Sequence, residues 1–118
     1  YDYISFDKYP QKLADLNLDL AVAPLEINNF NIAKSNLRLL EYGMMGWPVI
    51  CTDIDPYQLN SPPVTRVEND KEAWLAALQV ALANMDETKQ QGEALKRWVT
   101  ANYILEANLT VWKDALTP

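Results

Sequence analysis

Residues 34–41 carry the side chains best suited to chemistry in this sequence. Lys34, Ser35 and Asn36 are consecutive hydrogen-bond donors, and Glu41 follows seven residues after Lys34. In the first turn of a helix, these donors would join unpaired backbone N–H groups and a partial positive charge, which together attract phosphate. A carboxylate about two turns further along the same face can accept hydrogen bonds from two adjacent ribose hydroxyls. The spacing therefore predicts a nucleoside diphosphate site along one helix.

Alternating strands and helices are expected to position this site. Short apolar runs predict strands at residues 19–23 and 49–51, residues 64–67 are a third candidate strand, and residues 3–6 a further short strand or strand end. Periodicity and capping residues predict helices at residues 9–16, 33–45, 69–84, 86–103 and 105–116. Strands that alternate with helices indicate an α/β fold, here a Rossmann-like fragment with a short parallel sheet and a helical C-terminal tail. Ligands of such sheets bind beyond the carboxyl ends of the strands, which again favours the segments after Ala23 and Cys51.

Helical spacing predicts which face of each helix is buried. In the helix at residues 33–45, a buried stripe is expected at Leu37, Leu40 and Met44, and a different face at Lys34, Arg38, Glu41 and Met45. Core positions predicted in the later helices are Trp74, Leu78, Leu82, Met85, Leu95, Trp98, Val99, Asn102, Leu105, Leu109, Trp112 and Leu116. Residues 1–67 are expected to form the α/β part of one partial domain, and residues 68–118 its helical tail.

Composition excludes several classes of function. The net charge of −6 and the scattered Lys and Arg residues argue against a nucleic-acid partner. The absence of His excludes a Ser-His-Asp triad and most zinc sites. The single cysteine, Cys51, lies in an apolar run and is expected to be a buried thiol in a reducing compartment. No apolar run approaches the roughly 20 residues of a transmembrane helix. Because the sequence begins with Tyr1 rather than Met, we expect it to be an excerpt of a longer chain.

An ordered set of motifs over residues 19–57 resembles a known family. Residues 19–25 read Asp-Leu-Ala-Val-Ala-Pro-Leu, a predicted strand that stops at a proline. Phe30 and Asn31 follow, and residues 34–43 then read Lys-Ser-Asn-Leu-Arg-Leu-Leu-Glu-Tyr-Gly. Residues 46–50 complete the set as Gly-Trp-Pro-Val-Ile. This order resembles the C-terminal domain of group-one glycosyltransferases, the retaining family with the GT-B fold. Glu41 matches the second Glu of that family's motif, whereas Ala33 stands where the first Glu would fall.

The resemblance implies that the parent protein is a glycosyltransferase of hexosyltransferase type, acting on a nucleotide-diphosphate sugar. Lys34 and Glu41 would then be the catalytic residues, and Lys34, Ser35, Asn36 and Glu41 would bind the donor. The departure at Ala33 leaves the contacts to the sugar ring open. No metal or other cofactor is expected. The acceptor, which is a saccharide, a lipid or a protein, would be bound by an N-terminal domain of the same chain. Part of such an enzyme by itself is expected to be inactive, and the location to be the cytoplasm or the inner face of the membrane.

Other interpretations of the same residues stay open. Glu41 could pair with Arg38 three residues earlier, Lys34 could be a solvated lysine, and Ser35 and Asn36 could be helix caps. Asp53 and Asp55 are more often part of a capped loop than a catalytic or metal-binding pair. The alternative function is a non-catalytic Rossmann-like module that binds a nucleotide or a protein, and an epimerase on the same two-domain scaffold is a third.

Overall fold

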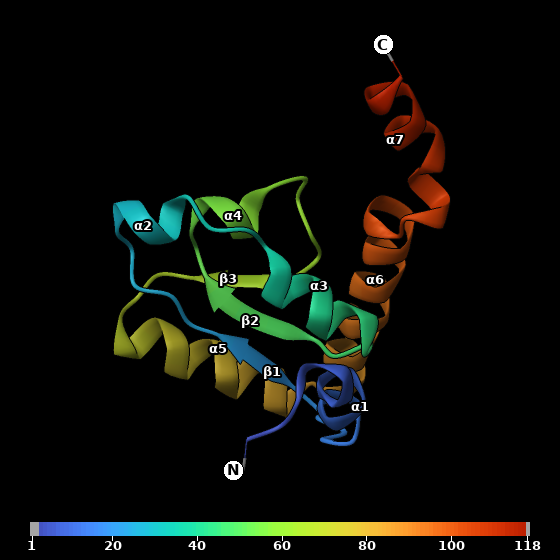
Figure 1. Ribbon diagram of the computed structural model, residues 1–118. Helices are drawn as coiled ribbons and strands as arrows, with labels where there is room; N and C mark the ends of the chain where they lie inside the picture. Colours follow the sequence, from blue (N-terminus) through green and yellow to red (C-terminus); the bar gives the residue numbers. More distant parts are fainter. Residues whose placement is uncertain (1–2, 118) are drawn as a thin grey trace.

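A computed structural model describes residues 3–117 and shows a small parallel sheet with helices packed around it (Figure 1). The helices are η1 (Phe6–Lys8), α1 (Tyr9–Ala14), α2 (Asn29–Ile32), α3 (Leu37–Met44), α4 (Asp55–Gln58), α5 (Lys71–Ala83), α6 (Met85–Tyr103), η2 (Glu106–Asn108) and α7 (Leu109–Leu116). The strands are β1 (Ala21–Ala23), β2 (Val49–Thr52) and β3 (Thr65–Val67).

The sheet confirms the predicted α/β class. Its strand order is β1-β2-β3, and both pairs of neighbours are parallel. Ala21 is in register with Val49, and Ile50 with Thr65. The central strand β2 is buried at all four positions, as expected for a strand covered on both faces. This short open sheet is compatible with a fragment of a Rossmann-like domain.

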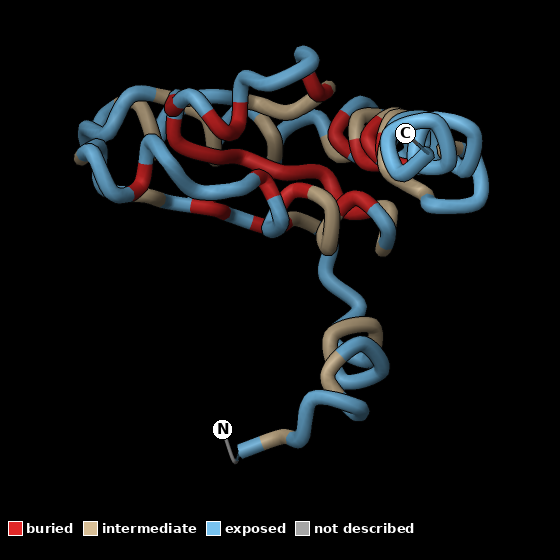
Figure 2. The backbone as a smooth tube through the Cα atoms, turned by 45° about the horizontal axis from the view of Figure 1, so that its top comes forward, coloured by how far each residue is buried: buried red, intermediate tan, exposed pale blue. Residues whose placement is uncertain are grey.

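Helices cover both faces of the sheet. In Figure 1, α3 and α4 lie on one side of the strands and α5 lies on the other, while α6 runs past the end of the sheet alongside α3. Figure 2 shows the buried backbone concentrated along β2 and along the facing parts of α3 and α6. The core therefore joins the sheet to the tail, so residues 68–103 are an integral part of the α/β body and more than an appended tail.

Two glycines allow α3 and α6 to approach closely. A Cβ atom on Gly43 would lie 2.6 Å from Cγ2 of Val99, and one on Gly92 would lie 2.2 Å from the backbone oxygen of Gly46. Gly46 itself has φ +75°, a left-handed conformation suited to the turn that ends α3. Gly43, Gly46 and Gly92 therefore help to position α3 and β2, the two elements that flank the predicted site.

The buried stripe predicted for α3 was wrong at Leu37 and Met44, whereas Leu40 does pack partly against the core. Leu39 is fully buried and Gly43 is also buried, whereas Leu37 is 57% exposed and Met44 is 39% exposed. Because Gly43 lies against α6, the helix turns this face inward, and a pattern based on large apolar side chains cannot detect such a contact. The predicted core positions Asn102, Leu82 and Trp112 are exposed as well.

Three other predicted segments differ from the structure. Residues 3–6 form no strand, and the chain enters η1 at Phe6. Residues 25–32, to which no helix or strand is assigned from the sequence, contain α2, whose start is capped by Asn28 accepting from the N–H of Asn31 at 2.8 Å. Because α2 uses residues up to Ile32, α3 begins only at Leu37.

The C-terminal segment leaves the body. Figure 1 shows α7 projecting away from the sheet, and large apolar side chains along it are exposed. Leu109, Trp112 and Leu116 are at least half exposed, so the predicted inner stripe of this helix is not buried by the residues described. Among residues 3–117, no helix combines the length and apolar character required to cross a membrane.

Candidate functional site

A cavity of about 220 Å³ lies beside the start of α3. It is lined by Leu25, Lys34, Ser35, Leu37, Arg38, Glu41 and Tyr57. Leu25 follows β1 and Tyr57 follows β2, so the cavity opens at the carboxyl ends of these parallel strands. This is the edge at which open α/β sheets bind ligands. Three of the four predicted site residues, Lys34, Ser35 and Glu41, therefore meet in one place, and Arg38 joins them.

The first turn of α3 faces this cavity without a side-chain cap. The helix begins at Leu37, so Lys34 and Ser35 precede it, and the prediction that they form its first turn was wrong. The N–H groups of Leu39 and Leu40 donate to the backbone oxygen of Asn36 at 2.9 and 3.3 Å. The N–H groups of Leu37 and Arg38, one turn too early for an intrahelical partner, are left for another acceptor. An anion beside this turn would meet both of them.

Asn36 occupies the N-cap position of α3 but does not act as a cap. Its side chain makes no capping hydrogen bond. It is buried, and its Nδ2 donates instead to the Tyr103 hydroxyl at 3.1 Å. Asn36 therefore joins α3 to the end of α6 and does not line the cavity. Its predicted contact with a nucleotide-sugar donor has no support in this geometry.

Lys34 is exposed at the rim, where its Nζ lies 4.9 Å from the centre of the Phe30 ring. Phe30 is 74% exposed, so the core does not anchor this loop side chain. Its neighbour Asn31 is buried and donates to the backbone oxygen of Glu26 at 2.7 Å, which shapes the loop rather than a ligand contact. A cation held over an aromatic face keeps its charge and stays near the cavity.

Glu41 faces two partners within the chain. Its Oε2 accepts from the Tyr9 hydroxyl at 3.2 Å and lies 3.5 Å from a guanidinium nitrogen of Arg38. The pairing with Arg38 that the sequence left open is therefore present. An ion pair this exposed contributes only about 0–1 kcal/mol, so it leaves the carboxylate available to a ligand. With Lys34 and Arg38 as cations and Glu41 as the anion, the cavity is locally positive in a chain of net charge −6.

A hydrogen-bond network centred on the buried Thr52 side chain fixes the cavity wall at Leu25. The Thr52 hydroxyl accepts from the Leu25 N–H at 2.8 Å and donates to Oδ1 of Asn69 at 2.9 Å. Nδ2 of Asn69 in turn donates to the Leu25 carbonyl at 2.5 Å. The ends of all three strands are thereby joined to the loop that leads to Lys34. Sequence reasoning missed Thr52 and Asn69 because neither belongs to a recognisable motif.

Burial affects the pKa of two further groups near the site, both of which are uncharged at neutral pH in any case. It raises the pKa of the Tyr57 phenol, which lines the cavity and keeps its proton over a wider pH range. It also raises the pKa of the Cys51 thiol to about 12, as expected for a thiol in an apolar environment. Cys51 is fully buried, in agreement with its predicted role in the core.

The carboxylates after β2 are engaged elsewhere. Asp53 lies 3.6 Å from Arg66 and accepts from Gln58 at 2.9 Å, while Asp55 is in the first turn of α4. Within the part of the chain that the structure describes, no group of three or more His, Cys, Asp and Glu residues could hold a metal ion. Both carboxylates therefore lie outside the lining of the cavity, and α4 begins without a side-chain cap.

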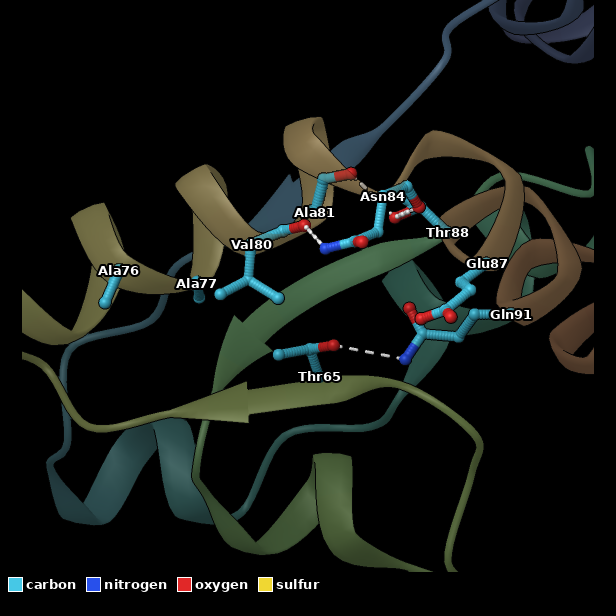
Figure 3. Close-up of a pocket in the computed structure, with 9 residues that line it drawn as sticks. All are labelled: Thr65, Ala76, Ala77, Val80, Ala81, Asn84, Glu87, Thr88 and Gln91. Atoms are coloured by element: carbon cyan, nitrogen blue, oxygen red, sulfur yellow. Dashed lines mark hydrogen bonds between the residues drawn. The ribbon is translucent and has the colours of Figure 1, made fainter.

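A larger groove of about 460 Å³ lies between β3, α5 and α6 (Figure 3). Apart from Glu87, its polar side chains are already paired with each other or with backbone. The single proton of the Thr88 hydroxyl is shared between the carbonyls of Ala81 and Asn84, at 2.8 and 2.9 Å, and Gln91 donates to Thr65 at 3.1 Å. The rest of its lining is mainly apolar, with Glu87 as its charged residue. The groove therefore lacks the cations and free donors that a phosphate group requires.

Comparison with known proteins assigns no family to the chain. No family model, curated protein or solved structure matches it. The cavity beside α3 and the resemblance of residues 19–57 are therefore the grounds for a functional proposal.

Proposed function

We propose that the cavity beside α3 binds a nucleoside diphosphate, and that the chain is the donor-binding part of a glycosyltransferase. The observation that carries the proposal is the uncapped first turn of α3, which faces a cavity shared by Lys34, Arg38 and Glu41. Backbone N–H groups at a helix start, reinforced by cations, form a well-known type of phosphate site. A carboxylate further along the same helix adds an acceptor for hydroxyl groups.

The roles of the residues follow from this arrangement. Lys34, Arg38 and the first N–H groups of α3 would hold the two phosphates. During transfer they would stabilise the negative charge that develops on the leaving diphosphate. Glu41 is the fifth residue of α3 and lies about 6 Å beyond Leu37 along the helix axis. There it would hold the ribose hydroxyls and fix the nucleoside.

The sugar that is transferred and its acceptor require groups beyond these residues. The resemblance places acceptor binding on an N-terminal domain, and Ala33 offers no polar contact to a donor sugar. The proposed contribution of this chain is therefore to bind and orient the donor and to stabilise its leaving group. A module that binds nucleotides without turnover would use the same cavity. Sugar transfer by the full-length protein would distinguish a glycosyltransferase from such a module.

Isothermal titration calorimetry tests the site with a panel of UDP, GDP, ADP and CMP, their common sugar conjugates, and inorganic pyrophosphate. Lys34→Ala is expected to weaken diphosphate and pyrophosphate binding alike, by about 1–3 kcal/mol for a charged hydrogen-bond partner. Glu41→Gln is expected to weaken only the nucleotides. Lys89→Ala, at an exposed position of α6 outside the cavity, is the matched control and should bind the panel as tightly as the unsubstituted chain does.

Salt dependence provides an independent check. Binding through exposed Lys34 and Arg38 should weaken as ionic strength rises, because salt screens charges that are open to solvent. If no member of the panel binds, or if Lys34→Ala and Lys89→Ala have equal effects, the cavity is not a diphosphate site.

A further inference from the structure

Tyr9 reaches the candidate site from a separate helix. It lies 32 residues before Glu41, and its hydroxyl donates to Oε2 of that carboxylate at 3.2 Å. The same hydroxyl lies 3.5 Å from a guanidinium nitrogen of Arg38, which can donate to it. A phenol hydroxyl that donates to a carboxylate makes the same contact that a ribose hydroxyl would make there. Tyr9 thus occupies a position on Glu41 that a ligand diol would require.

The helix that carries Tyr9 is only lightly attached. No residue of η1 or α1 is buried, although Leu13 packs partly against the core. Residues 15–19, which follow α1, are exposed, and Figure 2 shows α1 standing off the layered body. Elements with so few buried contacts open locally at small cost in free energy. Ligand binding at Glu41 can therefore displace α1 without disturbing the sheet.

The chemistry of the contact favours exchange of one hydroxyl for another. Burial and the neighbouring Glu41 carboxylate raise the pKa of Tyr9, so its hydroxyl keeps its proton and remains a donor. Among residues 3–117, the hydrogen bond from Tyr9 and the close approach of Arg38 both involve Oε2 of Glu41. A vicinal diol that donates two hydrogen bonds to one carboxylate approaches both oxygens at once. It would meet the phenol at Oε2.

Building on the proposed function, we propose that Tyr9 is an internal competitor for Glu41, which a ribonucleoside diphosphate displaces together with α1. The closed contact then lowers the apparent affinity for the nucleotide by the fraction of molecules that are open. It has no such effect on ligands without a diol. The Tyr9 contact accordingly reduces the preference of the site for ribonucleosides over ligands without a diol, and displacement of α1 restores that preference.

Tyr9→Phe removes the competing hydroxyl and preserves the ring, and Tyr3→Phe, at a residue that is 95% exposed, is the matched control. The titrations use the ribonucleoside diphosphate that binds best in the panel, its 2′,3′-dideoxy analogue, and inorganic pyrophosphate. Tyr9→Phe is expected to tighten ribonucleotide binding by about 3- to 10-fold, the range for loss of one competing hydrogen bond. The other two ligands should change less than about twofold, and Tyr3→Phe should change none.

Amide hydrogen exchange of α1 tests the displacement directly. Without ligand, the α1 amides should exchange faster in Tyr9→Phe than in the unsubstituted chain. In the unsubstituted chain, they should exchange faster with the ribonucleotide bound than without it. If Tyr9→Phe weakens the ribonucleotide, or if binding protects α1, Tyr9 supports the site and the competitor proposal is overturned. If the ribonucleotide binds equally well to Glu41→Gln, the assignment of Glu41 fails, whatever the exchange of α1 in Tyr9→Phe shows.

Discussion

Replacing Thr52 with valine removes one hydroxyl that joins β2 to the loop after β1. The side chain is fully buried, accepts from the Leu25 N–H at 2.8 Å and donates to Asn69 at 2.9 Å. Valine has nearly the same shape, so the apolar contacts of β2 should be preserved. The substitution therefore isolates the hydrogen bonds that hold the cavity wall.

The expected loss of stability depends on whether the Leu25 N–H and the Asn69 side chain can find other hydrogen-bond partners in Thr52→Val. The N–H of Leu25 is left without its acceptor in a partly buried position, which costs about 1–3 kcal/mol. Asn69 is exposed and can bond to water instead, so its share is small. We expect the free energy of unfolding to fall by about 1–3 kcal/mol. For a chain of this size, that lowers the melting temperature by roughly 3–10 °C.

Urea unfolding followed by tryptophan fluorescence measures this loss, with an unchanged m-value as the sign that the unfolded state is the same. Thr65→Val is the matched control, because its hydroxyl accepts one bond, from Gln91, in a more open position. It should lose no more than about 0.5 kcal/mol. Equal stabilities of Thr52→Val and Thr65→Val would refute the assignment of a structural role to the Thr52 network.

Two further predictions concern packing and the buried thiol. Gly92→Ala should lower the free energy of unfolding by about 2 kcal/mol in urea titrations, although alanine favours a helix, because its Cβ would meet the backbone of Gly46 and Pro48; unchanged stability would contradict the close approach of α6. Cys51 should react with a thiol reagent at the rate of unfolding. Because its pKa rises from 9.0 to about 12, the stability it contributes below pH 9 should be lost progressively as the pH rises from 9 toward 12; rapid labelling of the native chain at pH 8 would contradict its burial.

The sheet could be predicted because β1 and β2 lie in short apolar runs and all three strands are bounded by turn residues. Proline follows β1 and precedes β2, and Pro62 and Pro63 precede β3, so the limits of each run were visible in the sequence. The burial of β2 on both faces also follows from its unbroken apolar character. Parallel pairing was then the arrangement expected for strands separated by helices.

The start and the phase of α3 could not be predicted in the same way. Asn28 caps a short helix that ends at Ile32, and residues 33–36, which pattern analysis assigned to α3, form the turn between the two helices. The buried face of α3 is set by Gly43 against α6, a contact in which the smallest residue is the one inside. Hydrophobic periodicity detects large side chains and is blind to this kind of interface.

The candidate site was predicted in part. Lys34, Ser35 and Glu41 could be grouped because they are close in sequence, and the cavity does bring them together. Tyr9 and Asn36 could not be placed correctly, since their partners lie 32 and 67 residues away and depend on how the helices pack. Contacts at such separations leave no trace in the local pattern.

The most direct test of the diphosphate site is an NMR titration of the ¹⁵N-labelled chain with the panel of nucleoside diphosphates. If the first turn of α3 holds the phosphates, the largest shifts on binding should be those of the amides of Leu37 and Arg38, with smaller shifts around Glu41. Shifts confined to the groove between α5 and α6, or no saturable shifts, would contradict the assignment of the cavity to a nucleoside diphosphate.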